Sequence, residues 1–93
     1  MIPVLPPAYE AVTFGGALRA AAGRWPGKVA VRMASRAITY ADLVARSHAL
    51  RNAALAMGLG PGDRAAIVAR NTPEYFEVAA GLPDAGVALA TIN

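Results

Sequence analysis

Ninety-three residues limit this sequence to one small domain or to a piece of a larger one. Hydrophobic residues make up 56% of it and charged residues only 16%, so such a short chain carries more apolar surface than it can easily bury. The absence of cysteine excludes disulfide bonds and cysteine metal sites, and nine basic against six acidic residues leave a formal charge of +3.

Neither a nucleic-acid-binding nor a membrane-spanning class is supported. The bases are spread from Arg19 to Arg70 without clustering or interleaved aromatic residues, whereas nucleic acid requires a basic patch. Charged residues, glycine or proline interrupt every apolar run before about 18 residues, the length that a spanning helix needs. Residues 1–7 lack a positive start and contain three prolines, which argues against a secretory signal, so we expect a cytoplasmic protein.

The chain begins with residues 1–12, which hold three of the seven prolines and no periodicity, and this predicts an extended lead-in. A helix should follow, because Thr13 suits an N-cap and apolar residues recur after it at helical spacing. These residues are Phe14, Leu18, Ala21 or Ala22, and Trp25. Gly15 and Gly16 weaken the first turn by about 1 kcal/mol each relative to alanine, so tertiary packing must hold this helix in place.

Two short β-prone runs come next. Residues 28–33 alternate between apolar and other side chains, and residues 36–39 are short and rich in strand formers. Together they predict a hairpin that turns at Ala34 and Ser35. This turn lacks the Asn-Gly or Asp-Gly pair that favours tight hairpins.

The strongest helix signal begins at Thr39. Its hydroxyl can accept a hydrogen bond from a free backbone N–H, and Asp42 lies where the helix dipole is positive. Residues at steps of three or four then predict one buried face: Leu43, Val44, Ser47, Leu50, Ala54 and Met57. Gly58 suits the left-handed residue that follows a helix, and Leu59 can supply the accompanying apolar contact.

A turn and a strand follow this helix. Pro61 and Gly62 fit the two central positions of a type II turn. Residues 65–69 form an apolar run of strand length without polar alternation, which predicts a strand covered on both faces, as in a parallel sheet. The glycines before it lack GxGxxG spacing and lead from a helix into a strand, so a cap and a turn explain them better than a phosphate loop.

Thr72 and Pro73 mark the start of another helix, with Thr72 as its cap and Pro73 in its first position. Pro83 lacks an N–H for the carbonyl one turn earlier, so the helix should kink or stop near the residue before it. Gly86 closes the next turn, and residues 87–92 form a second apolar strand. The order is therefore helix, hairpin, helix, strand, helix, strand. Its last four elements indicate an α/β fold with parallel strands.

Few residues carry a chemical signal. His48 has no ligand or general-base partner at a recognisable spacing, which favours an ordinary helix histidine. A cap and a turn explain Asp42 and Asp63 separately, so they are weak candidates for a carboxylate pair. Tyr75 and Phe76 fit a core position better than a stacking platform.

Asn71 is the candidate for a role beyond packing. It follows a predicted parallel strand and precedes a helix, and ligands of open α/β sheets gather at the carboxyl ends of strands. A local helix-capping role is the simpler interpretation, and Asn93 occupies a similar position after the last strand. The sequence thus predicts no catalytic residue and no metal ligand in this chain, with Asn71 as the candidate for a substrate cleft.

These features, taken together, resemble the opening segment of the adenylate-forming enzymes. The shared order is Thr39-Tyr40-x-x-Leu43, a helix, Gly-x-x-Pro61-Gly62-Asp63-Arg64, an apolar strand, Asn71, Ala85-Gly86 and a strand ending in Asn93. That superfamily includes acyl-CoA synthetases, adenylation domains of peptide synthetases and luciferases. In such proteins the last helix usually runs on to the Ala-Gly pair, whereas Pro83 interrupts it here. The resemblance makes residues 13–93 an incomplete α/β subdomain, the N-terminal part of an AMP-binding domain.

The resemblance also implies a function for the full-length protein. Similar enzymes use Mg-ATP to convert a carboxylic acid to an acyl-adenylate, release pyrophosphate and transfer the acyl group, usually to CoA. Their phosphate loop and catalytic lysine come later than the segment matched here, so we expect no activity and no bound cofactor from these 93 residues alone. The alternative is a non-catalytic α/β interaction module that self-associates through exposed strand edges.

Overall fold

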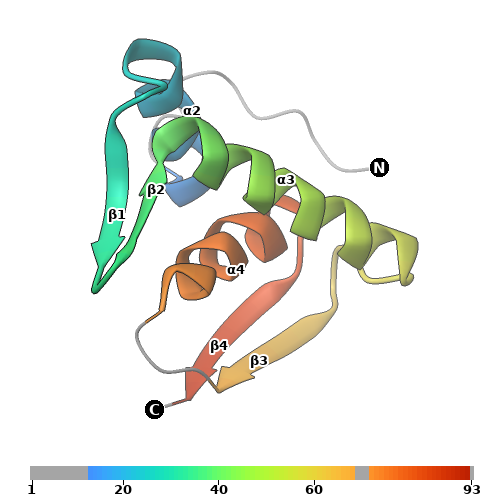
Figure 1. Cartoon of the computed structure of the whole chain (residues 1–93). Coiled ribbons are helices and arrows are strands. Elements are labelled where there is room, and N and C mark those ends of the chain that lie inside the picture. The colour runs from blue at the N-terminus through green and yellow to red at the C-terminus, as the bar shows by residue number, and fades with distance from the viewer. Residues whose placement is uncertain (1–12, 69–71, 93) are drawn as a thin grey trace.

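A computed structural model describes residues 13–68 and 72–92, and their elements follow the predicted order (Figure 1). The bounds are α2 (Phe14–Arg24), β1 (Val29–Met33), β2 (Arg36–Thr39), α3 (Tyr40–Ala56), β3 (Arg64–Val68), α4 (Pro73–Asp84) and β4 (Ala88–Ile92). Helix α4 lies between α3 and the β3–β4 pair. Helix α2 and the β1–β2 hairpin pack against α3 and α4, away from the β3–β4 pair. The predicted lead-in falls on residues 1–12, outside the described residues.

Helix α2 begins as the sequence predicts. The Thr13 hydroxyl accepts a hydrogen bond from the backbone N–H of Gly16 at 3.0 Å, so the predicted cap is confirmed. Gly15 and Gly16 are buried, which agrees with a helix held by packing rather than by propensity. Trp25, expected on the apolar face, is instead the residue after the last helical turn and is 49% exposed.

The hairpin is antiparallel and turns at Ala34 and Ser35, as predicted. Burial does not alternate regularly along β1. The pairing register with β2 shifts between Val29 and Val31, and the neighbouring residues Ala30 and Val31 are both half-buried. Ala34 has a φ of 53°, in the left-handed region that glycine or asparagine adopts more easily. The missing turn signature therefore leaves an alanine in a strained conformation.

Ala34→Gly should raise the free energy of unfolding by about 0.5–1 kcal/mol, because glycine relieves the left-handed strain. Urea denaturation followed by circular dichroism measures the change. Ala37→Gly is the matched control, since Ala37 is an exposed residue of β2 without a positive φ. The control should lower stability, because glycine weakens a strand. Equal effects of the two substitutions would contradict the strain at Ala34.

Both ends of α3 agree with the sequence. Thr39 accepts from the N–H of Asp42 at 3.2 Å, which confirms the N-cap. At the other end Gly58 has a φ of 90°, and the N–H of Leu59 donates to the carbonyl of Ala54 at 3.0 Å, the closing bond of a Schellman motif. Met57, predicted on the buried face, is the residue after the last helical position and is 79% exposed.

The turn between α3 and β3 is also confirmed. Gly62 has a φ of 89°, and the N–H of Asp63 donates to the carbonyl of Gly60 at 3.0 Å, as a type II turn with Pro61 and Gly62 at its centre requires. The Asp63 carboxylate accepts from the N–H of Gly60 at 2.8 Å, which closes the turn from its other side.

Helix α4 begins at Pro73 after Thr72, as predicted, and differs from its prediction in the cap hydrogen bond and at its C-terminal end. Thr72 has the extended backbone of an N-cap, but its side chain makes no cap hydrogen bond. The helix does not stop before Pro83 and continues to Asp84. Proline is tolerated there because it removes only one bond near the helix end, and the N–H of Ala85 still reaches the carbonyls of Gly81 and Leu82. The helix thus runs up to the Ala-Gly pair, as in the resembling family.

Strands β3 and β4 form the predicted parallel pair, with Arg64 opposite Ala88 and Val68 opposite Ile92. The expectation that β3 is covered on both faces is wrong for the described part of the chain. Burial alternates along β3, and Val68 is 75% exposed, because α4 covers one face and no described element covers the other. Parallel sheets are normally buried on both faces, so this pair presents an open apolar surface.

The core lies where the three helices meet the hairpin. Its buried cluster consists of Leu18, Ile38, Leu43 and Ala80. Helices α3 and α4 approach so closely that a Cβ added at Gly81 would lie 2.6 Å from the backbone oxygen of Ser47. Glycine at this position therefore sets the distance between the two helices.

Candidate functional site

The predicted cleft residue cannot be placed in the structure, because Asn71 and Asn93 both lie outside the described residues. The described neighbours of Asn71 are the end of β3 at Val68 and the start of α4 at Pro73. Strands β3 and β4 run in the same direction, so their carboxyl ends share one edge of the sheet. That is the edge at which open α/β sheets bind ligands, and Asn71 stays a prediction.

Glu74, in the first turn of α4, links this end of the molecule to the hairpin. Its carboxylate is 2.7 Å from the Arg36 guanidinium, and both side chains are about half exposed. The pKa of Glu74 lies below its ordinary value of 4.5, first because the carboxylate accepts from its own backbone N–H and second because Arg36 donates to it. An ionised Glu74 therefore stabilises this junction.

Glu74→Gln should make the folded chain less dependent on pH in the acidic range. A carboxyl group whose pKa is lowered by folding stabilises the fold above its unfolded pKa, near 4.5, and loses this contribution as the pH falls through the lower folded value. Urea denaturation at several pH values below 5 should therefore show a smaller slope for the variant. Arg36→Gln should remove only part of the slope, because the backbone bond remains. An unchanged slope in both variants would contradict the assignment.

An apolar groove of about 430 Å³ opens between the hairpin, α2, α3 and α4. Its walls include Phe14, Leu18, Val31, Leu43 and Phe76, and Arg32 and Tyr40 also line it. Phe14 and Phe76 face each other with ring centroids 6.4 Å apart. The groove can hold apolar groups, but its polar residues do not form a catalytic arrangement.

The remaining chemical candidates do not converge. Asp42 lies in the first turn of α3 and Asp63 follows the turn beyond its other end, and the helix between Asp42 and Ala56 is about 21 Å long, so the two residues are no carboxylate pair. His48 is half-buried on α3, and its Nε2 atom is buried without a hydrogen-bond partner. The Ser47 hydroxyl donates to the Val44 carbonyl of its own helix at 2.8 Å. The described residues contain no group of three metal-ligating side chains.

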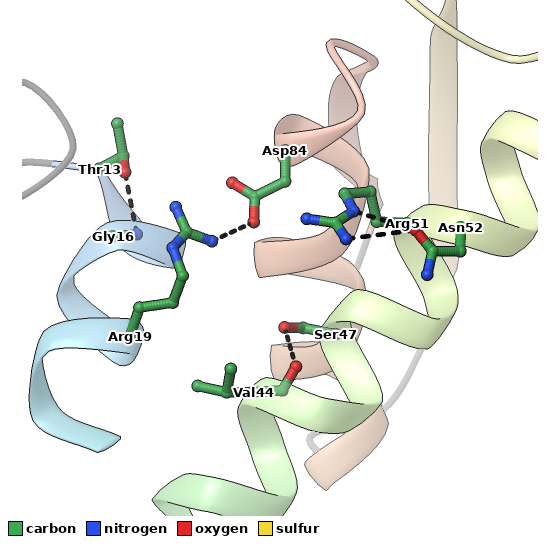
Figure 2. Close-up of polar contacts among 8 residues, drawn as sticks. All are labelled: Thr13, Gly16, Arg19, Val44, Ser47, Arg51, Asn52 and Asp84. Carbon is green, nitrogen blue, oxygen red and sulfur yellow. Dashed lines mark hydrogen bonds and ion pairs between the residues drawn. The ribbon is translucent and has the colours of Figure 1, made fainter. Parts of the chain in front are cut away.

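A second polar cluster ties α2 to the end of α4 (Figure 2). The Asp84 carboxylate, which would repel the negative end of the α4 dipole, accepts from Arg19 at 2.6 Å. It lies so close to α2 that a Cβ on Gly15 would be 2.7 Å from it. This cluster therefore links α2 to the C-terminal end of α4.

The described part of the chain, 13–68 and 72–92, has no helix with the length and apolarity to span a membrane. It is an α/β segment that supplies a parallel strand pair, an open sheet face and a groove, but no complete catalytic site.

The comparisons with known proteins define the class of this segment. The model of a family described as AMP-binding enzyme matches residues 18–93. A feruloyl-CoA synthase from Amycolatopsis sp. is 38% identical over 68 residues, covering 73% of this chain and 14% of that protein. A fatty acid–[acyl-carrier-protein] ligase from Streptomyces coeruleorubidus is 34% identical, covering 73% of this chain and 13% of that protein.

Solved structures agree. The fatty acyl CoA synthetase of Mycobacterium tuberculosis has a TM-score of 0.83 at 26% identity, covering 95% of this chain and 18% of that one. The fold is thus that of the N-terminal domain of adenylate-forming enzymes. The chain belongs to the AMP-binding enzyme family and spans about one seventh of the length of the curated relatives given above.

Sequence reasoning missed the groove and the Arg19–Asp84 pair. The groove collects side chains from four elements, and the paired residues are 65 positions apart. No local pattern marks such contacts. The apolar excess of the composition was the one available signal for an uncovered apolar surface.

Proposed function

We propose that this chain is the N-terminal part of an ATP-dependent acid–thiol ligase. The full-length enzyme would use Mg-ATP to convert a carboxylic acid to an acyl-adenylate with release of pyrophosphate, and would transfer the acyl group to CoA. The family match over residues 18–93 carries the proposal. The described residues add no acid–base pair, nucleophile or metal cluster, so the chain alone should be inactive.

The substrate class is proposed from the similar proteins. Their names specify a feruloyl-CoA synthase and a fatty acid ligase, which are an aryl and an alkyl carboxylic acid activity. An acyl or aryl acid is therefore the proposed substrate of the full-length enzyme, and the cytoplasmic location stays a prediction. The groove is not assigned to the acid, because its lining does not include a group positioned to activate a carboxylate.

The test begins with the gene downstream of the codon for Asn93. If the reading frame continues, the full product should catalyse ATP–pyrophosphate exchange that depends on ferulate or a fatty acid, and the 93-residue chain should not. Exchange by the short chain would contradict its predicted inactivity. A full product that shows no exchange with aryl or alkyl acids would overturn the ligase proposal.

The sheet supports a proposal about partners. We propose that the open face and edges of β3 and β4 are covered by the remainder of the ligase, and that the isolated chain self-associates there. Val68, at the end of β3, is a large apolar residue that is 75% exposed. Light scattering after gel filtration should show oligomers of the chain that Val68→Lys disperses. Ala66 is also exposed, and Ala66→Ser is a mild control on the same strand. A chain that stays monomeric would contradict the proposed self-association.

A further inference from the structure

The charge of the chain is divided unevenly along the sequence. No acidic residue occurs between Glu10 and Asp42, whereas this stretch holds five bases. Two of them are paired with acids of α4, since Arg19 binds Asp84 and Arg36 binds Glu74. The other three are Arg24, Lys28 and Arg32, and none has a carboxylate partner in the described parts of the chain.

Two of these unpaired cations lie against the ring of the single tryptophan. The Arg24 guanidinium carbon and the Lys28 ammonium each lie 5.5 Å from the ring centroid of Trp25. All seven residues of 23–29 are exposed, which is the longest exposed run in the described residues. Arg32 lies four residues beyond Lys28 in β1, about 13 Å away along the strand, and lines the apolar groove, so it is not part of this cluster. We call Arg24, Trp25 and Lys28 the basic corner.

The junction of α2 and β1, which carries the basic corner, lies at the opposite end of the molecule from the β3–β4 pair (Figure 1). Its position separates it from the open sheet face, where the rest of a ligase is proposed to pack. Trp25 is 49% exposed although two cations lie against its ring, so the basic corner is open to solvent.

The chemistry of the corner fits an anionic lipid surface. A tryptophan ring is favoured at the boundary between lipid headgroups and acyl chains, and adjacent bases are attracted to anionic headgroups. A nucleic acid is the poorer fit, because single-strand binding stacks successive bases on several aromatic side chains along a basic groove, and this corner offers one ring. Duplex binding needs more phosphate contacts than two cations provide.

We propose that the basic corner docks this protein on membranes containing anionic phospholipid, with Trp25 at the interface and Arg24 and Lys28 against the headgroups. The contact is peripheral, since the described residues contain no helix that could span a membrane. The proposal does not depend on the ligase assignment, because it uses only the charge and exposure of this corner.

Tryptophan fluorescence of the 93-residue chain tests it directly, because Trp25 is the one reporter. Vesicles of phosphatidylcholine with phosphatidylserine should shift its emission to the blue, protect it from acrylamide and sediment the protein at low salt. Vesicles of phosphatidylcholine alone should do none of these. High salt should release the protein, because the attraction to the headgroups is screened.

The double variant Arg24→Gln with Lys28→Gln should lower the partition onto anionic vesicles by roughly 30-fold, the effect expected for two bases near an anionic surface. Arg51→Gln with Arg64→Gln is the matched control, since it removes the same net charge from α3 and β3 and should change the partition by less than about threefold. Circular dichroism should show both variants folded.

Three outcomes would overturn the proposal. One is an unshifted emission of the unmodified chain on anionic vesicles, which no folding defect of a variant could explain. Another is an equal loss of vesicle binding in both double variants, which would show that binding depends on the net charge of the protein and not on the basic corner. The third is binding to duplex DNA at low salt without binding to vesicles, which would replace the lipid by nucleic acid.

Discussion

Gly81→Ala should lower the free energy of unfolding by about 1–3 kcal/mol, although alanine is the better helix former by about 1 kcal/mol. The added Cβ would lie 2.6 Å from the backbone oxygen of Ser47 and 3.3 Å from the Cβ of Leu50. A backbone oxygen cannot rotate away as a side chain can, so α3 and α4 would have to separate. Separation would also loosen Ala80, which is only 1% exposed.

Gly23→Ala is the matched control, because Gly23 lies inside α2 and an added Cβ would meet nothing within 4 Å. This control should raise stability by up to about 1 kcal/mol. Urea denaturation of both variants, followed by circular dichroism, gives the comparison. Stabilisation by both substitutions would show that α3 and α4 do not touch as closely as described.

The contrast between these glycines shows what the sequence could predict. Gly58 and Gly62 were assigned positive φ because a helix end and a proline stood directly beside them, and both assignments are confirmed. Gly81 carries no such neighbour, since its role depends on Ser47 in another helix. Residues adjacent in the sequence were therefore enough to predict caps and turns, whereas the contact between two helices could not be predicted from them.

The same reasoning applies to burial and to the site. Val68 was expected to be covered because apolar strands usually are, but the described chain supplies a helix for only one face. Trp25 has helical spacing with Leu18 yet lies past the helix end, beside two bases that seemed dispersed along the sequence. The position after an apolar strand pointed to Asn71, which lies outside the described residues and stays a prediction.

Leu43→Ala should produce the largest loss of stability in the described chain, about 2–5 kcal/mol. Leu43 is 1% exposed and belongs to the cluster formed with Leu18, Ile38 and Ala80. It also lines the apolar groove, so truncation would join a new cavity to an existing one. The surrounding helices would then not close the space that the Leu43 side chain leaves, so the full cost of the cavity would be measured. For a domain of this size, the loss is a large part of the total stability.

Leu55→Ala is the matched control, because Leu55 lies on the same helix and is 48% exposed. It removes the same atoms with the same change in helix propensity, so it should cost less than about 1 kcal/mol. Urea midpoints measured with Trp25 fluorescence and with circular dichroism would report both variants independently. A loss for Leu43→Ala no larger than that for Leu55→Ala would mean that the cluster around Leu43 is not the core. The groove beside it would then lie between loosely packed elements, and the α2–α3–α4 packing described above would have to be abandoned.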